Sequence, residues 1–463
     1  MLDLREVWTL LGSGRWLTSD PGAAQPMLTA VSTDTRHLPA GALFVALRGE
    51  RHDGHDHIAQ AVAAGAAALL VERWTPACQV PAFCVRDTRQ ALAELAAGWR
   101  RRFALPVIAV TGSNGKTTVK EMIAAILAAW VGEADRLATQ GNLNNEIGVS
   151  LTVFRLRDTH RAAVFELGMN HPGEIAGLAG MVQPQVALVN NAQREHQEFL
   201  GSVEATAREN GAVIAALPAD GVAVYPGDDA AHRPIWAALA GSRRSLSFGL
   251  DAGCAVHAPA DARPEAFDLH LPGQTVSVRL AIAGQHNVRN ALAAAACCHA
   301  VGVPAVTIAT GLAAFRPVAG RLRHLQAASG AALIDDSYNA NPDSVRAAID
   351  VLAARTAPRV LVLGDMGEVG AEGPRFHAEV GAYARDRGIE RLLGFGAASA
   401  GTVAAYGTGA EHYETIESLC ARARECAVPG ATVLVKGSRS MRMERVVQAL
   451  ATADEAAQIG GHA

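Results

Sequence analysis

The stretch 109–120 reads A-V-T-G-S-N-G-K-T-T-V-K and decides how the rest of the chain is interpreted. An apolar strand at 107–110 runs directly into a glycine loop, and a helix-compatible sequence follows at once. Such a loop can bind phosphate, because glycines let backbone N–H groups approach the oxygens and the helix dipole favours negative charge. The usual pattern, G-x-x-x-x-G-K-[ST], fails, since Val110 stands in the place of its first glycine. A tight turn that carries a lysine by chance is the alternative, but the context favours a nucleotide loop of a shorter form.

The loop supplies a set of candidate nucleotide contacts. Lys116 is expected to reach the terminal phosphates, and Thr117 to hold magnesium. The full predicted set is Gly112, Ser113, Asn114, Gly115, Lys116, Thr117 and Thr118.

Continuous apolar runs, interpreted as buried strands, recur along the chain. They include 43–47 and 67–72, then 106–110, 162–167 and 186–191, then 331–336, 359–365, 391–396 and 432–437. Apolar strands separated by helices predict parallel sheets covered on both faces. Pro106 and the region near Phe315 divide the chain into three α/β units, predicted at 1–104, 105–315 and 316–463. The last stretch, 453–463, is predicted to be a frayed tail.

Composition excludes several classes of protein. The 463 residues carry 41 Lys plus Arg against 45 Asp plus Glu, which argues against bulk electrostatic binding of nucleic acid. Seven cysteines without a C-x-x-C motif are typical of free thiols in a reducing compartment. The N-terminus lacks the pattern of a signal peptide, and the longest apolar run, 61–71, is too short to span a bilayer. We therefore expect a soluble, cytoplasmic protein without membrane insertion, and a monomer because no coiled-coil pattern occurs.

Further motifs carry a resemblance to a known family. The loop T-G-x-N-G-K-T-T resembles that of the ATP-dependent Mur ligases and of their relatives, the folylpolyglutamate synthases. The other matching segments are S-T-D-T-R at 32–36, Q-G-N-L-N-N-E-I-G at 140–148, E-L-G-M-N-H-P-G-E-I at 166–175, G-Q-H-N-V-R-N at 284–290, D-D-S-Y-N-A-N-P-D-S at 335–344, L-G-D-M-G-E-V-G at 363–370 and V-K-G-S-R-S at 435–440. D-S-Y-N-A-N-P together with G-D-M-G-E resembles the branch of the Mur ligases that uses D-alanyl-D-alanine.

The resemblance implies a fold and a reaction. It implies a central P-loop-type ATPase domain with a parallel sheet, an N-terminal α/β domain for a UDP-linked substrate and a C-terminal Rossmann-like α/β domain. The implied substrates are UDP-N-acetylmuramoyl-tripeptide and D-alanyl-D-alanine, with ATP and Mg²⁺. A carboxylate of the tripeptide would attack the γ-phosphate to form an acyl phosphate, and the dipeptide amine would displace phosphate to form an amide. Both reactants are anionic, so cations must bring them together.

The resemblance also assigns site residues by position. Glu166 would bind magnesium, His196 would be a ligand of a second magnesium, and both would act with Lys116 in catalysis. His286, Asn287 and Asn290 would contact adenine, whereas Arg321 and Asp336 would bind phosphate and ribose. The substrate set would be Ser32, Asp34, Thr35 and Arg36 for the UDP moiety, and Asn339, Asn341 and Arg439 for the dipeptide.

Each of these segments also has a plain structural interpretation. Without the resemblance, Glu166 is a solvated strand end and His196 is a surface histidine in a polar loop. Segment 284–290 would cap a helix, and 32–36 would be a polar turn.

One position departs from the family. The family's carbamylated lysine, which adds a negative group near magnesium, corresponds to Asn210, and asparagine cannot form a carbamate. We predict that the neighbouring Glu209 supplies this charge as a possible metal ligand, although one helical residue is about 100° of rotation. The departure keeps open a non-catalytic ATP-binding switch, and the loop alone keeps open a folylpolyglutamate synthase. A G-F-G at 394–396 is too weak to indicate a dinucleotide site.

Overall fold

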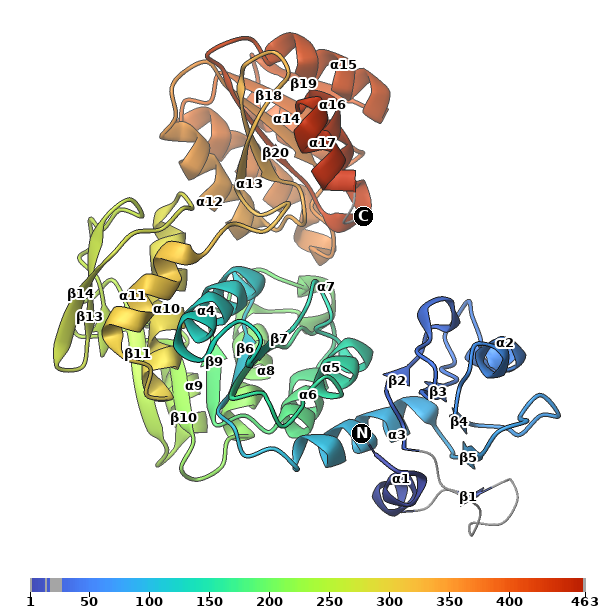
Figure 1. The fold of residues 1–463 in the computed structure, drawn as a ribbon. Coiled ribbons are helices and arrows are strands. Elements are labelled where there is room, and N and C mark those ends of the chain that lie inside the picture. The colour runs from blue at the N-terminus through green and yellow to red at the C-terminus, as the bar shows by residue number, and fades with distance from the viewer. Residues whose placement is uncertain (1, 13–14, 17–26, 461–463) are drawn as a thin grey trace.

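The computed structural model describes residues 2–12, 15–16 and 27–460, and its strands form three separate sheets (Figure 1). Most neighbouring strands within each sheet are parallel, and helices lie between them in the chain. This confirms the predicted three-domain α/β class. The boundaries at 104 and 315 fall between the sheets, and we keep them as proposed domain limits.

The N-terminal sheet is small and has the order β1-β5-β4-β3-β2, with only β1 antiparallel. Its strands are β1 Arg15–Trp16, β2 Val31–Ser32, β3 Leu43–Val45, β4 Ala68–Val71 and β5 Ala82–Cys84. The helices are α1 Leu4–Leu11, η1 Thr35–His37, η2 Gly54–His57, α2 Ile58–Ala63 and α3 Thr88–Arg100.

Helix α3 attaches this unit to the central domain. Leu92, Leu95 and Trp99 share one apolar core with residues of the central helices. The buried Arg100 guanidinium donates to the backbone oxygens of Phe103 and Val182, at 2.6 and 2.8 Å. The N-terminal unit is therefore anchored along this helix.

The central sheet has nine strands in the order β14-β13-β12-β11-β10-β9-β6-β8-β7. Strands β6 to β12 all run parallel. The bounds are β6 Val107–Thr111, β7 Arg136–Ala138, β8 Ala162–Glu166, β9 Val186–Val189, β10 Val222–Pro226, β11 Arg244–Gly249, β12 Val256–His257, β13 Phe267–Leu271 and β14 Gln274–Val278. The helices are α4 Lys116–Val131, α5 Glu146–Val153, α6 Glu174–Val182, α7 Gln197–Leu200, α8 Val203–Ala215, α9 Arg233–Ala240, α10 Gln285–Ala300 and α11 Ala305–Ala314.

Two apolar cores cover the two faces of this sheet, as buried parallel strands require. Helices α4, α10 and α11 supply one core, and α5, α6 and α8 supply the other. The prediction of a wholly parallel sheet was incomplete, because β13 pairs antiparallel with both β12 and β14. Alternate residues of β13 are buried, a half-buried pattern that a search for continuous apolar runs overlooks.

The C-terminal sheet has the order β15-β16-β20-β17-β18-β19, parallel except for β15. Its strands are β15 Arg323–Gln326, β16 Ala332–Asp336, β17 Arg359–Gly364, β18 Arg391–Phe395, β19 Ala410–Tyr413 and β20 Thr432–Lys436. The helices are α12 Pro342–Ala353, η3 Gly370–Glu372, α13 Gly373–Asp386, α14 Ser399–Tyr406, α15 Ile416–Cys426, η4 Arg439–Met441, α16 Glu444–Leu450 and α17 Ala453–Gly460.

Helix α17 corrects the predicted frayed tail over 453–460, and residues 461–463 of that prediction lie outside the described residues. Residues 453–460 are helical, and the Glu455 carboxylate accepts a 2.9 Å hydrogen bond from the Gln326 backbone N–H. Ala456 packs against the C-terminal core. The helix spans only eight residues and is rich in alanine, so the sequence pattern did not distinguish it from a tail. Across the described ranges, no helix is both long and apolar enough to cross a membrane.

Candidate functional site

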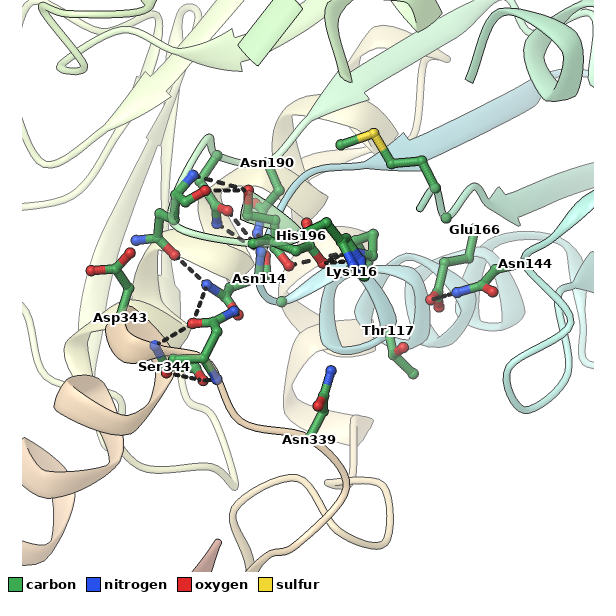
Figure 2. Close-up of a pocket in the computed structure, with 18 of the residues that line it drawn as sticks. Asn114, Lys116, Thr117, Asn144, Glu166, Asn190, His196, Asn339, Asp343 and Ser344 are labelled. Atoms are coloured by element: carbon green, nitrogen blue, oxygen red, sulfur yellow. Dashed lines mark hydrogen bonds and ion pairs between the residues drawn. The ribbon is translucent and has the colours of Figure 1, made fainter. Parts of the chain in front are cut away.

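A cleft of about 1620 Å³ lies where the three units meet. The N-terminal unit contributes Arg89 and Ala93 of α3 to its wall. The central domain contributes the glycine loop and the carboxyl ends of its strands, and the C-terminal domain contributes Arg321, Asp336 and their neighbours. Figure 2 shows the part of this cleft around the loop.

The glycine loop adopts backbone conformations that only glycine accommodates easily. Gly112 has φ 132° and Gly115, which precedes α4, has φ 80°. A Cβ on Gly115 would lie 2.6 Å from the Asn290 side-chain oxygen, and one on Gly112 would lie 3.0 Å from the Asn190 backbone nitrogen. Both glycines are therefore required by conformation and by space.

Lys116 is the first residue of α4, and its ammonium group folds back over the loop. Nζ donates to the backbone oxygens of Gly112 at 2.7 Å and Ser113 at 3.2 Å, and to Glu195 Oε1 at 2.7 Å. The Lys116 and Glu195 side chains are only 15% and 11% exposed. The predicted phosphate-binding cation is thus paired with a carboxylate that the sequence did not single out (Figure 2).

Glu166 ends strand β8 directly beside the loop strand, since it is in register with Val110 of β6. Its side chain is 1% exposed. Asn144 Nδ2 donates to Oε1 at 2.8 Å, while Oε2 is buried and has no hydrogen-bond partner among the described residues. The solvated strand end is therefore excluded as the interpretation of Glu166.

His196 lies in a strained turn that faces the C-terminal domain. Its φ is 50°, unusual for a residue with a side chain. Nδ1 lies 2.6 Å from Glu368 Oε2, and Nε2 lies 3.6 Å from Glu195 Oε1. The ring is 12% exposed, so a freely solvated histidine is also excluded.

The predicted adenine segment belongs to a chain of amides. Asn290 Nδ2 donates to Asn287 Oδ1 at 2.9 Å, and Asn190 Nδ2 donates to Asn290 Oδ1 at 3.0 Å and to the Asn114 backbone oxygen at 2.8 Å. Asn341, the N-cap of α12, forms a reciprocal amide pair with the Asn114 side chain, with Asn341 Nδ2 donating at 2.8 Å. The network links α10, the loop and the C-terminal domain.

His286 lies at the start of α10 beside this network. Desolvation and the positive charge of Lys436 lower its pKa to about 4. The ring is therefore neutral at physiological pH, which suits contact with an uncharged aromatic base.

The C-terminal residues gather around Tyr338. The Arg321 guanidinium stacks 4.2 Å from the centroid of its ring, and that of Arg439 lies 5.6 Å away. Asp336 accepts from Lys436 Nζ at 2.7 Å, and the same ammonium donates to the Asn339 backbone oxygen at 2.8 Å. Arg321, Asp336, Asn339, Asn341 and Arg439 all line the cleft. The roles of the first two towards ATP and of the other three towards the dipeptide stay predictions.

The predicted UDP contacts do not line this cleft. Ser32, Asp34, Thr35 and Arg36 lie in and around η1, where Asp34 pairs with Arg36 at 2.7 Å. The Arg36 side chain is 79% exposed. Their role in binding a UDP group stays a prediction.

Glu209 requires a correction, because it is not directed to the cleft. Its carboxylate accepts from the backbone N–H groups of Gly173 at 2.9 Å and Ile175 at 3.0 Å, at the start of α6. A carboxylate is favoured at a helix N-terminus, and the rotation of one residue along α8 turns Glu209 away from the loop. The predicted metal ligand is therefore a helix cap.

Asn210 lies on the side of α8 that faces the loop and is fully buried. Its Oδ1 accepts from the Thr111 hydroxyl at 2.5 Å and from the Gly112 N–H at 3.0 Å, and its Nδ2 donates to the Thr206 oxygen at 3.1 Å. Asn210 thus fixes the start of the glycine loop through hydrogen bonds.

Replacement of Asn210 by alanine is expected to destabilise the central domain by about 2 kcal/mol, because two buried donors lose their acceptor. Thermal or urea unfolding measures this change. Arg208→Ala, on the exposed face of the same helix, is the matched control and should change stability by less than about 0.5 kcal/mol. Equal stability of the two variants would contradict a supporting role for Asn210.

Several functional candidates were missed by sequence reasoning, namely Asn144, Asn190, Glu195, Glu368 and Lys436. For Lys436, the sequence did contain a signal. The chain contains only three lysines, Lys116, Lys120 and Lys436, among 41 basic residues of which the rest are arginines. No comparable signal marks Glu195, whose position depends on the turn at His196.

The cleft, with its phosphate-type loop between three α/β units, defines a nucleotide-binding multidomain protein, and comparison with known proteins gives the family. Residues 28–100 match the model of the Mur ligase family catalytic domain, 110–298 the Mur ligase middle domain and 320–439 the Mur ligase glutamate ligase domain. The chain belongs to the Mur ligase family.

Individual relatives cover nearly the whole chain. UDP-N-acetylmuramoyl-tripeptide–D-alanyl-D-alanine ligase of Escherichia coli is 43% identical over 94% of this chain and 96% of its own. A crystal structure of MurF from Acinetobacter baumannii is 35% identical, with a TM-score of 0.89 over 96% of this chain and 97% of its own. MurF ligase from Thermotoga maritima, solved in complex with ADP, is 25% identical, with a TM-score of 0.81 over 94% and 98%.

Proposed function

We propose that the protein is an ATP-dependent peptide ligase that adds D-alanyl-D-alanine to UDP-N-acetylmuramoyl-tripeptide, a late step in building a peptidoglycan precursor. The observation that carries the proposal is the placement of Lys116 and Glu166 at the ends of adjacent parallel strand–loop units, facing one cleft shared by three domains. The 43% identity to a ligase of that name supports the choice of substrates.

The residues suit the binding of ATP across two domains. Lys116 and the N-terminus of α4 would attract the phosphates. Neutral His286, with Asn287 and Asn290, would contact the base from α10. Arg321 and Asp336 would meet the nucleotide from the C-terminal domain, so that closure of the cleft excludes water from a reactive acyl phosphate.

The donor set also fits Mg²⁺, which prefers oxygen ligands and keeps part of its water shell. Glu166 Oε2 is buried without a partner among the described residues, and Thr117 lies in the same cleft. We propose that Glu166 and Thr117 hold one ion and that His196 is a ligand of a second, and these ions would shield the negative charges of the two reacting groups. Within the described ranges, no three His, Cys, Asp or Glu side chains lie together as a group that could hold a metal ion.

The remaining residues bind and orient the substrates in this proposal. Asn339, Asn341 and Arg439 would position the incoming dipeptide, and Ser32, Asp34, Thr35 and Arg36 would contact UDP. The expectation of a monomer, which comes from the lack of a coiled-coil pattern in the sequence, stays a prediction.

Phosphate release from ATP tests the function directly. Purified protein is supplied with UDP-N-acetylmuramoyl-tripeptide carrying either meso-diaminopimelate or lysine, with and without D-alanyl-D-alanine, and product mass is recorded. We expect phosphate only with the dipeptide, and a product heavier by one dipeptide less water. Binding of ATP without turnover on either tripeptide would instead favour a non-catalytic switch, and glutamylation of a folate would favour the folylpolyglutamate synthase.

A further inference from the structure

The ammonium group of Lys116 has no donor left for a phosphate in this structure. An ammonium has three N–H donors, and they are directed to the Gly112 oxygen, the Ser113 oxygen and Glu195 Oε1. The two carbonyls belong to the loop that holds the lysine, so the contact with Glu195 is the one that a ligand can replace. Entry of a phosphate therefore requires Glu195 to give up the lysine.

Glu195 is itself under-satisfied in this position. Its side chain is 11% exposed, and Oε2 is buried without a hydrogen-bond partner among the described residues. A buried carboxylate oxygen with no donor is unfavourable. The Lys116–Glu195 ion pair is therefore poorly suited to stabilise the fold. It is suited to exchange, in which a ligand replaces Glu195 as the partner of Lys116.

The backbone on both sides of Glu195 is anchored to the C-terminal domain. Arg194 contacts Asp343 at 2.6 Å and Glu379 at 2.7 Å, and His196 contacts Glu368 at 2.6 Å. With its neighbours held in this way, Glu195 is directed towards the loop.

We propose that Glu195 is a positioning residue that neutralises Lys116 in the empty site and releases it to nucleotide phosphate when a divalent cation compensates the carboxylate. The proposal rests on the proposed function, because it takes Lys116 as the phosphate-binding cation. Without a divalent cation, the carboxylate both competes for Lys116 and repels the phosphates. With the cation present, the freed carboxylate faces positive charge and no longer opposes binding.

The test is the affinity for ADP, measured by isothermal titration calorimetry in EDTA and in Mg²⁺. In EDTA, Glu195→Gln should bind ADP about tenfold more tightly than wild type, the size expected for loss of one competing charged hydrogen bond. In Mg²⁺ the affinity of Glu195→Gln for ADP should exceed that of the wild type by less than about threefold. Glu198→Gln removes the same charge from an exposed position in α7 and should match wild type in both buffers.

The outcomes separate the two proposals. If the wild type binds ADP but Glu195→Gln has unchanged or weaker affinity for ADP in EDTA, the proposed role of Glu195 is overturned. The proposed nucleotide site is then left intact. Wild type that binds no ADP in either buffer overturns the proposed function and this inference with it. Glu195→Ala serves as a second variant, and thermal unfolding confirms that each variant is folded.

Discussion

Lys116→Met is expected to lower kcat of the ligase reaction by about 10²–10³-fold, the usual effect of removing one preorganised charged group from a reacting phosphate. The methionine side chain keeps a similar length and helix propensity, so the loss reports the ammonium group itself. Steady-state release of phosphate with both substrates measures the effect. A variant that retains more than a tenth of the wild-type kcat would show that the loop does not act on phosphate.

The same substitution should also disturb stability, for a reason unrelated to catalysis. Glu195 would lose its cation in a site where its second oxygen already lacks a hydrogen-bond partner in the described part of the chain. The double variant Lys116→Met with Glu195→Gln should therefore recover stability but not activity. This separation distinguishes a chemical role for Lys116 from a purely structural one.

Lys436→Met is expected to destabilise the C-terminal domain by about 3–5 kcal/mol, because it leaves a buried carboxylate without its cation. The Lys436 and Asp336 side chains are 4% and 13% exposed, and the ammonium also serves the Asn339 oxygen. Urea unfolding followed by circular dichroism measures the change.

Two further variants control this measurement. Arg391→Met breaks an exposed ion pair with Glu411 in the same sheet and should cost less than about 1 kcal/mol. Adding Asp336→Asn to Lys436→Met should restore part of the loss, since no charge is then left unpaired. If Lys436→Met and Arg391→Met lower the free energy of unfolding equally, the Lys436–Asp336 pair contributes no more to stability than an exposed ion pair.

Much of the fold was predictable because its signals are local. Buried parallel strands are continuous apolar runs, so strands in all three sheets were found from the sequence, although the fully buried central strand β10 Val222–Pro226 was not among them. The half-buried strand Phe267–Leu271 is not a continuous apolar run and was missed, and the short helix Ala453–Gly460 was misassigned as a tail. Their structure depends on neighbours distant in sequence, such as the contact of Glu455 with Gln326.

The candidate site was likewise predictable in part, where its signals are local in the sequence. Lys116 and Glu166 follow apolar strands, and the carboxyl ends of parallel strands meet at one edge of a sheet. Glu209 was misassigned because a residue's position in sequence does not give its direction around a helix. Glu195 was missed because a left-handed turn at His196 and anchors in another domain determine its direction.

The scarcity of lysine gives this protein an unusual surface chemistry. Lys120 is fully buried, Lys436 is 4% exposed and Lys116 is 15% exposed. Amine-directed acylation of the folded chain therefore has one partly accessible side-chain target, and that target is in the glycine loop. A bound nucleotide would shield it, so the extent of acylation reports occupancy of the site. Attachment of this protein to supports through lysine would, for the same reason, block the group that we propose to bind the phosphates.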